Sequence, residues 1–396
     1  MKNVIEEANA RVRIQEGTRV IEQLLLECYF KPGISTKELA RKTLLPVPVA
    51  AAIKKELIKE GVLEQERGVR CTAEGNAYIE NDWGYKGLDK TLYQKLAAKE
   101  TDWRSELPDV LSSLRDLFQA RPQVNVQIDQ SKCTPETSLA RAILCLRDHS
   151  LIGKKVLCVG DDDFVSVSLG FLLKRLFPDI NEPKATIHVA DIDERFLSYI
   201  REIAGREGLP VTCHRLDLRQ PLPEELQGRY DCFFTDPPYT LQGLNLFISR
   251  GISGLKKAKG LPIFLSFAHK APDVLLAIQR EFVRMGLVAK EVIPHFNEYE
   301  GAEMIGNRSQ MIVLKTTEQT APDIGGAFED ALYTGEVKRT VRTYRCKQCG
   351  HSAVVGFQED IVTVEQLKNE GCRVCANDTF DLIGKKTAER SDDLSP

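Results

Sequence analysis

Carboxylates gather at two short motifs in the middle of the chain. Residues 160–163 read Gly-Asp-Asp-Asp and residues 236–239 read Asp-Pro-Pro-Tyr, and each motif ends an apolar, strand-like segment. Two further strand-like segments end in Asp191 and Asp217. Carboxylates at this density attract cations and repel phosphates. The chemistry they suit is therefore the binding of a positively charged ligand.

These acids belong to a regular alternation of strand-like and helical segments between Gly153 and about Lys315. The strand-like runs are KKVLCVG, ATIHVAD, PVTCHRLD, YDCFFTD, LPIFLSFA, LVAKEVIPHF and SQMIVLK. Such alternation predicts an α/β fold with a doubly wound, mostly parallel sheet that helices cover on both faces. Ligands of these sheets bind beyond the carboxyl ends of the strands, so we expect the acidic strand ends to lie together.

The first of these loops departs from the pattern of nucleotide-binding folds. Dinucleotide sites place G-x-G-x-x-G after the first strand so that the backbone can approach a pyrophosphate. Here one glycine precedes three carboxylates, which disfavours NAD, FAD and ATP. The simpler interpretation, a solvated turn, is weakened because the run lies between a buried strand and the apolar helix FVSVSLGFLLKRLF.

The Asp-Pro-Pro-Tyr sequence is typical of enzymes that alkylate nitrogen. In such motifs the acid and the following Pro carbonyl accept hydrogen bonds from the attacking N–H groups, and consecutive prolines hold that geometry rigid. The aromatic ring covers a base or a cation. A turn that merely ends the strand is the alternative. Together with the acidic loop, the motif indicates alkylation of an amine in a negatively charged pocket.

The eleven cysteines fall into two groups. Seven are scattered through apolar stretches and are interpreted as reduced, buried residues. The other four, Cys346, Cys349, Cys372 and Cys375, form two C-x-x-C pairs. Two such pairs suit tetrahedral coordination of Zn²⁺, and with all four positions occupied by thiolates the zinc is expected to be structural. A pair of redox dithiols is the less favoured alternative.

The flanking segments predict further modules. Residues 17–81 resemble a winged helix-turn-helix domain, in which Lys54, Lys55 and Lys59 would face DNA. Because Glu56 and Glu60 share that helix, we favour a dimerisation or scaffolding role, and a homodimer is expected. The remaining units are a helical connector at 82–150, the catalytic domain at 151–316, a linker at 317–340, a zinc-ribbon-like module at 341–382 and a disordered tail at 383–396. The connector contains one possible strand, QVNVQIDQ.

Composition narrows the classes of protein. The 396 residues carry a formal net charge of −3, which argues against bulk electrostatic capture of nucleic acid without excluding it. No apolar run approaches the ~18 residues of a membrane span, and the charged amino terminus lacks a signal peptide. We therefore expect a cytoplasmic protein without membrane contact.

The order and spacing of the acids resemble the nucleoside-binding half of S-adenosylmethionine-type transferases, a Rossmann-like fold. That resemblance implies that Asp191 holds the ribose hydroxyls and that Asp217 reads the adenine amino group. The combination of Gly-Asp-Asp-Asp and Asp-Pro-Pro-Tyr behind a winged-helix-like front domain resembles the branched-chain polyamine synthases over about residues 17–315. The four-cysteine module is not assigned by this resemblance.

The resemblance implies an activity and a set of site residues. The donor would be decarboxylated S-adenosylmethionine, the acceptor spermidine at its central secondary nitrogen, and methylthioadenosine would leave in each of two transfers. The expected catalytic residues are Asp162, Asp236 and Tyr239. The expected donor-binding residues are Gly160, Asp161, Asp163, Asp191 and Asp217. The expected acceptor-binding residues are Pro237, Glu298 and Glu300, with Glu303 as a further candidate.

Two other functions stay open. A nucleic-acid N-methyltransferase using S-adenosylmethionine would explain the front domain, the cysteine module and the Pro-Pro-Tyr motif, but not three aspartates in the first loop. A transcription factor or polyamine sensor with a transferase-like core would bind without catalysis.

Overall fold

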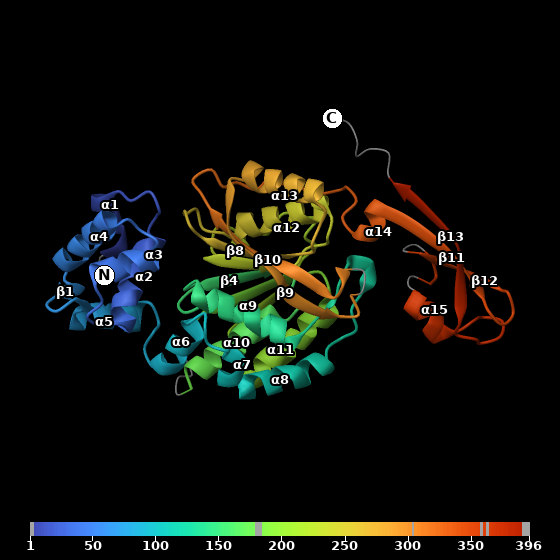
Figure 1. Ribbon diagram of the computed structural model, residues 1–396, viewed down its shortest axis with the longest axis horizontal. Helices are drawn as coiled ribbons and strands as arrows, with labels where there is room; N and C mark the ends of the chain where they lie inside the picture. Colours follow the sequence, from blue (N-terminus) through green and yellow to red (C-terminus); the bar gives the residue numbers. More distant parts are fainter. Residues whose placement is uncertain (1–3, 179–183, 303–304, 357–358, 362–363, 390–396) are drawn as a thin grey trace.

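A central α/β domain lies between an N-terminal group of helices and a small C-terminal module (Figure 1). The computed structural model describes residues 4–178, 184–302, 305–356, 359–361 and 364–389. Among these residues, no helix combines the length and the apolar character that crossing a membrane requires.

The N-terminal region contains four helices followed by a pair of short strands. Its elements are α1 (Val4–Val12), α2 (Arg19–Phe30), α3 (Thr36–Thr43), α4 (Val47–Lys59), β1 (Leu63–Gln65), β2 (Val69–Cys71), α5 (Ala73–Ala77) and the π-helical turn η1 (Tyr78–Asp82). The Ser35 side chain accepts a hydrogen bond from the Glu38 backbone N–H, as the sequence predicts for the start of α3. Strands β1 and β2 pair antiparallel, so the predicted order of helices and hairpin is present.

The segment expected to connect the two regions is mainly helical. It comprises α6 (Lys90–Ala97), α7 (Trp103–Glu106), α8 (Pro108–Gln119), the 3-10 turn η2 (Val126–Ile128), β3 (Lys132–Cys133) and α9 (Pro135–Arg147). The strand predicted for QVNVQIDQ is wrong. Asn125 accepts a hydrogen bond from the Gln127 N–H and Asp129 adopts a left-handed conformation, so side-chain bonding to the local backbone favours a turn over a strand there.

The sheet of the central domain confirms the predicted doubly wound α/β architecture. Its strands are β4 (Lys155–Val159), β5 (Thr186–Asp191), β6 (Val211–Arg215), β7 (Cys232–Thr235), β8 (Pro262–Phe267), β9 (Leu287–Glu300) and β10 (Arg308–Thr316), with β3 at one edge. In the described residues their order is β3-β9-β10-β8-β7-β4-β5-β6. Strands β4 to β8 run parallel, and β10, β9 and β3 are antiparallel.

Helices cover both faces of this sheet, and each face has its own apolar core. The helices are α10 (Val165–Leu176), α11 (Glu194–Glu207), α12 (Leu241–Gly254) and α13 (Pro272–Arg284), with the short turn η3 (Glu224–Leu226). Figure 1 shows α12 and α13 on one face and α9, α10 and α11 on the other. Buried side chains form a separate cluster on each side. The strand order reverses between β4 and β7, which places a ligand crevice at their carboxyl ends.

The C-terminal module begins with the helical turn α14 (Thr334–Val337). It continues with β11 (Lys338–Cys346), β12 (Ser352–Gly356), α15 (Val364–Glu370) and β13 (Phe380–Glu389), and the strands form a sheet in the order β12-β11-β13. Strand β13 runs through the start of the tail that the sequence predicts to be disordered, because its backbone pairs with β11. Residues 390–396 of that tail lie outside the described residues.

Candidate active site

The acidic strand ends meet in one pocket at the carboxyl edge of the parallel strands. The residues of the motifs and strand ends that line it are Gly160, Asp162, Asp191, Asp217, Asp236 and Pro238. Five of these six were predicted, and we call this site the acidic pocket. Pro237 is buried and does not line it; its neighbour Pro238 does.

The backbone conformation of Gly160, at the start of the loop after β4, leaves room for the acidic pocket. Gly160 has a φ of +75°, which a side chain would make strained, and an added Cβ would lie 3.4 Å from Cε1 of Phe247. The next residue donates its backbone N–H to Oδ2 of Asp191 at 2.9 Å. Oδ1 of Asp191 accepts the N–H of Asp193 at 2.8 Å, so this acid is fixed by the backbone before any ligand arrives.

Asp161 acts as a helix cap, which the sequence prediction of donor binding did not anticipate. Its carboxylate accepts the backbone N–H groups of Val165, at 2.8 Å, and Ser166, at 3.2 Å, at the start of α10. The side chain is buried, and burial raises its pKa to about 8. Its carboxylate therefore holds the loop on the helix.

Asp162 is the member of the triplet that faces the pocket. Its Oδ2 lies 3.3 Å from the backbone N of Ser131, which donates to it. Burial and then the nearby carboxylates of Asp163, Asp191 and Asp236 raise the pKa of Asp162 well above its usual value. A cation bound here would oppose that shift, so the site favours a positively charged ligand.

Asp163 and Asp236 meet on one buried guanidinium. Arg141, on α9, donates from Nη1 to Oδ2 of Asp163 at 2.5 Å and from Nη2 to Oδ2 of Asp236 at 3.0 Å. Its Nε donates to Oδ1 of Asn297 at 2.9 Å. Burial and then the Asp163 carboxylate raise the pKa of Asp236 to about 7, although Arg141 opposes the shift. The positively charged Arg141 thus links the Gly-Asp-Asp-Asp and Asp-Pro-Pro-Tyr motifs.

Two phenols continue this network. The hydroxyl of Tyr299, on β9, donates to Oδ2 of Asp236 at 2.6 Å and lies 3.0 Å from Oγ of Ser309. The hydroxyl of Tyr239 donates to that of Tyr299 at 3.2 Å. The Tyr239 ring makes an edge contact with Phe267. The motif tyrosine is therefore oriented by its hydroxyl and packed along its ring.

Glu298 and Glu300 lie on the other side of β9. Side chains alternate along a strand, and Asn297 and Tyr299 are buried whereas both glutamates are exposed. Glu298 pairs with Arg308 at 3.2 Å. The structure thus places the expected acceptor-binding glutamates away from the acidic pocket, and Glu303 lies outside the described residues.

The expected linker supplies part of the pocket wall. Leu332 and Tyr333 line the acidic pocket, and Oγ1 of Thr240, next to the Asp-Pro-Pro-Tyr motif, donates to the Leu332 carbonyl at 2.8 Å. Arg219 donates to both carboxylate oxygens of Glu336, at 3.0 and 2.9 Å. We call residues 323–337 the C-terminal strap, because the strap closes one side of the pocket.

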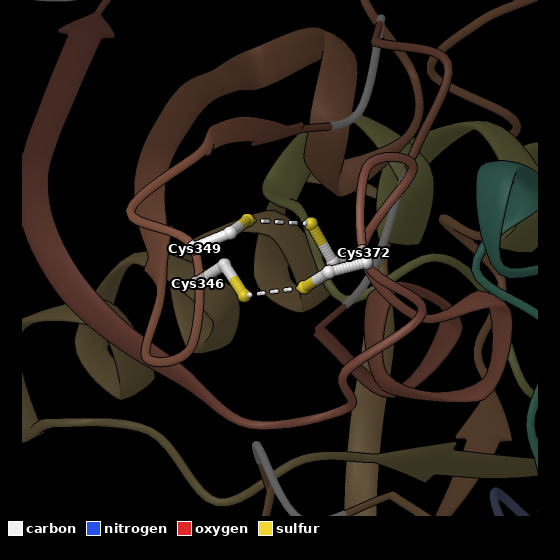
Figure 2. Close-up of side chains that lie close together, drawn as sticks. Cys346, Cys349 and Cys372 are labelled. Atoms are coloured by element: carbon white, nitrogen blue, oxygen red, sulfur yellow. Dashed lines mark hydrogen bonds between the residues drawn. The ribbon is translucent and has the colours of Figure 1, made fainter.

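The four paired cysteines also converge. Their sulfur atoms all lie within 4.8 Å of one another, and Cys346–Cys375 and Cys349–Cys372 are each separated by 3.5 Å between Sγ atoms. Figure 2 shows the sulfurs of Cys346, Cys349 and Cys372 turned toward a common centre. Four thiolates about 2.3 Å from one Zn²⁺ would be separated by similar distances, so the arrangement fits a tetrahedral metal.

Comparison with known proteins identifies the relatives of this chain. A family model described as the branched-chain polyamine synthase A C-terminal domain matches residues 109–370. The chain belongs to the branched-chain polyamine synthase family. The match extends from α8 to the four-cysteine module and includes both acidic motifs.

Individual members of the family align over most of the chain. An N(4)-bis(aminopropyl)spermidine synthase of Thermococcus kodakarensis is 31% identical over 76% of this chain and 83% of its own length. An uncharacterized protein of Methanocaldococcus jannaschii is 37% identical over 98% of this chain and 93% of its own length. The crystal structure of the Thermus thermophilus branched-chain polyamine synthase, with N4-aminopropylspermidine and 5'-methylthioadenosine, matches with a TM-score of 0.50 at 23% identity, over 83% of this chain and 96% of that one. This match shows the shared Rossmann-like fold.

Arg141 and Tyr299 belong to the site of this chain, but sequence reasoning missed both. Arg141 lies in a helix that was assigned to a connector, and no motif marks it. Tyr299 lies between the two glutamates that were singled out. Strand periodicity was the available signal, since a buried Asn297 predicts a buried residue at position 299 as well.

Proposed function

We propose that this chain is an aminopropyltransferase that moves aminopropyl groups from decarboxylated S-adenosylmethionine to the secondary amine of spermidine. The observation that carries the proposal is the convergence of Asp162, Asp163 and Asp236 on a small cavity that shares Gly160, Asp162 and Asp236 with the acidic pocket. Both substrates are cations, and without these acids they would repel each other. The family membership and the names of the relatives support the same activity.

The proposed reaction is a nucleophilic substitution at carbon. The N4 lone pair of spermidine attacks the aminopropyl carbon bound to sulfur, the C–S bond breaks, and its electron pair stays on sulfur in neutral methylthioadenosine. The new N4 ammonium then loses its proton, and a second transfer gives a quaternary nitrogen that has no proton to lose. Deprotonating an amine of pKa ~10 costs roughly 4 kcal/mol at neutral pH, so the site must favour the free amine.

In this proposal the acids divide the work. Asp162 holds the donor ammonium or accepts the amine proton, and in the first transfer Asp236 orients the attacking nitrogen through its N–H. Tyr239 forms a wall that favours positive charge. Asp191 and Asp217 would hold the nucleoside, as the resemblance to S-adenosylmethionine-type transferases implies. Intact S-adenosylmethionine carries an additional carboxylate, which the acids would repel.

The test is to incubate the purified chain with spermidine and either decarboxylated or intact S-adenosylmethionine, followed by mass spectrometry. Gain of one or two aminopropyl units, only with the decarboxylated donor, is the expected result. No mass gain on spermidine, or methylation of an added oligonucleotide with the intact donor, would overturn the proposal.

We also propose that the four cysteines hold a structural Zn²⁺ and that the N-terminal helices and hairpin form a winged-helix module. The clustering of the thiols supports the first assignment, and the order of α2, α3, α4, β1 and β2 supports the second. The homodimer stays a prediction, and sedimentation velocity tests it.

A further inference from the structure

A buried cation lies directly against the acidic pocket. Arg141 is 2% exposed and belongs to α9, outside both sequence motifs. A permanent positive charge beside a site for cationic ligands opposes their binding, and burying a guanidinium is itself unfavourable unless it is well paired. Arg141 should therefore have a function that compensates for these two unfavourable effects, and its contacts indicate which.

Those contacts join three separate parts of the chain. The planar guanidinium binds Asp163 in the loop after β4, Asp236 in the turn after β7 and Asn297 on β9. Its Nη2 also donates to the Tyr299 hydroxyl at 3.1 Å. A guanidinium offers its donors in a fixed fork, so this one side chain sets the separation of two carboxylates that belong to different motifs.

The charges around Asp236 show what the guanidinium does electrically. The titratable and charged groups that face Asp236 are Arg141 from α9, Asp162 and Asp163 from the loop after β4, Tyr299 from β9, Tyr239 from its own turn and the thiol of Cys133 from β3. Arg141 is the cation in this set. Oδ1 of Asp163 is buried and accepts no hydrogen bond from the protein. If the cation were absent, the Asp163 carboxylate would raise the pKa of Asp236 without an opposing charge and favour a proton on Asp236.

We propose that Arg141 is a positioning residue that holds the carboxylates of Asp163 and Asp236 at a fixed separation and favours the ionised form of Asp236, so that Asp236 can accept the N–H of the attacking amine. The inference rests on the proposed aminopropyl transfer. A proton on Asp236 would turn the acceptor into a donor and leave the amine N–H without a partner. Arg141 disfavours the binding of cationic ligands, and this effect is offset because Asp236 stays able to accept a hydrogen bond from the amine.

A purely structural role for Arg141, as a tie between α9 and β9, makes different predictions. Loss of such a tie would lower stability and the amount of active enzyme without changing how activity depends on pH. The proposed role changes the acidic limb of the pH profile, because that limb reports the ionisation of the essential carboxylate. The two roles are therefore separable.

The experiment compares Arg141→Lys and Arg141→Met with Arg147→Met across pH. Arg147 is a matched control on the same helix, since its guanidinium donates to the carbonyl oxygens of Leu96 and Ala98. We expect Arg141→Met to lower kcat by about 100-fold at neutral pH, with little change in the KM for the amine, and to move the acidic limb up by about one pH unit. Arg141→Lys should recover part of kcat and keep the limb near that of the wild type.

A double variant separates the electrostatic effect of Arg141→Met from a loss of activity caused by misfolding. Arg141→Met with Asp163→Asn removes one charge of each sign, so Asp236 keeps Asp162 as a neighbour but loses the Asp163 carboxylate that raises its pKa. Its acidic limb should return toward the wild-type position. An unshifted limb in Arg141→Met, or an equal shift in Arg147→Met, would overturn the proposal.

A readout that needs no turnover separates this inference from the proposed function. Carboxyl ¹³C NMR of aspartate-labelled protein, with the Asp236 signal assigned through Asp236→Asn, reports the titration directly. The midpoint should be higher in Arg141→Met than in the wild type. If the wild type makes no aminopropylated product, the proposed function fails while this comparison still decides whether Arg141 controls Asp236. If the wild type transfers and the midpoint stays constant, only the role of Arg141 fails.

Discussion

The acidic pocket and the four-cysteine module both gather groups that bind cations, but they stabilise these groups differently. In the pocket, protein atoms already satisfy many of the acids: backbone N–H groups bind Asp161 and Asp191, and Arg141 binds Asp163 and Asp236. In the module, the cysteine sulfurs lie in close contact with one another. The apolar cluster of the module contains Val355, Ile361 and Leu367 as its buried members among the described residues.

This difference distinguishes a site for ligands that come and go from a site for a resident ion. A pocket whose acids keep protein partners stays folded when substrate leaves. If the proposed zinc is bound, a small module with few buried side chains and four clustered thiols should depend on it to fold. The following predictions test the contrast, beginning with the largest expected effect.

Replacing the pocket-facing acid should abolish catalysis without unfolding the protein. Asp162→Asn keeps the size of the side chain and its contact with Ser131 while removing the charge that would attract a cation. We expect kcat to fall by at least about 1,000-fold, given the strength of electrostatic stabilisation in a buried site. Steady-state kinetics and a thermal melt measure the two effects. Asp273→Asn, at an exposed position in the first turn of α13, is the control, and normal turnover by Asp162→Asn would refute the assignment.

Removing the metal should unfold the module and leave the central domain intact. After dialysis against a zinc chelator, or in Cys349→Ser, we expect protease cleavage within residues 338–389, because structural zinc contributes folding energy directly. The central domain has its own clusters of buried residues and should melt at an unchanged temperature. Zinc content by atomic absorption and limited proteolysis check this. Cys213→Ser is the control, and a module that resists protease equally without metal would contradict the contrast.

The two regions should respond to pH in opposite directions. The pKa of Asp236 is about 7 and that of Asp161 about 8, both above the usual range, so the folded state binds protons more tightly than the unfolded state. Between about pH 4 and pH 8 the central domain should therefore lose stability as pH rises. The module should hold zinc more tightly over the same rise, since the metal competes with protons for thiols.

Thermal melts of wild type and Asp236→Asn across this pH range measure the first effect. The variant should lose less stability than the wild type as pH increases. Parallel curves for the two proteins would show that Asp236 is not the group that titrates.

Weakening the C-terminal strap should impair donor binding moderately. Glu336 accepts hydrogen bonds from Arg219 and from the backbone N–H groups of Leu332 and Tyr333, and the last two residues line the pocket. We expect Glu336→Gln to raise the KM for the donor by about three- to tenfold, in keeping with the loss of one charged hydrogen bond. Glu207→Gln removes a surface partner of Lys174 and serves as the control. A larger effect on kcat than on KM would assign the strap a different role.

The smallest effect is expected for the exposed glutamates of β9. Glu298→Gln should change the KM for spermidine by less than about twofold, because its exposed partner is Arg308 and surface pairs contribute little. Tyr299→Phe is the informative comparison on the buried side of the same strand. A strong effect of Glu298→Gln would return this residue to the acceptor site.

The sequence predicts the parts of the site that local chemistry reveals. Gly160, Asp162 and Asp236 lie in short motifs at strand ends, and parallel strands bring those ends together whatever the details of packing. The four cysteines are equally readable, since the spacing of ligands is itself the signal. The fold class follows for a similar reason, because buried strands and helices alternate along the chain.

Other residues of the site depend on contacts between distant segments. Arg141 occupies one turn of an ordinary amphipathic helix, and only the packing of α9 against the loop after β4 and the turn after β7 gives it two carboxylate partners. Leu332 and Tyr333 lie in a polar stretch that has the composition of a linker. The register of β9 decides which of its side chains is buried, since a shift by one residue exchanges Tyr299 with Glu298 on the buried face.

Contacts across the buried network join residues that are far apart in the chain: Arg141 meets Asn297, 156 positions later, and Tyr299, 158 positions later. During synthesis on the ribosome, the nascent chain therefore exposes this arginine long before its partners on β9 emerge. The network closes only after β9 and β10 have left the exit tunnel, so the enzyme should become competent late and abruptly in translation. Any product released before residue 297 would leave Arg141 without its partners on β9 and should be removed by quality control.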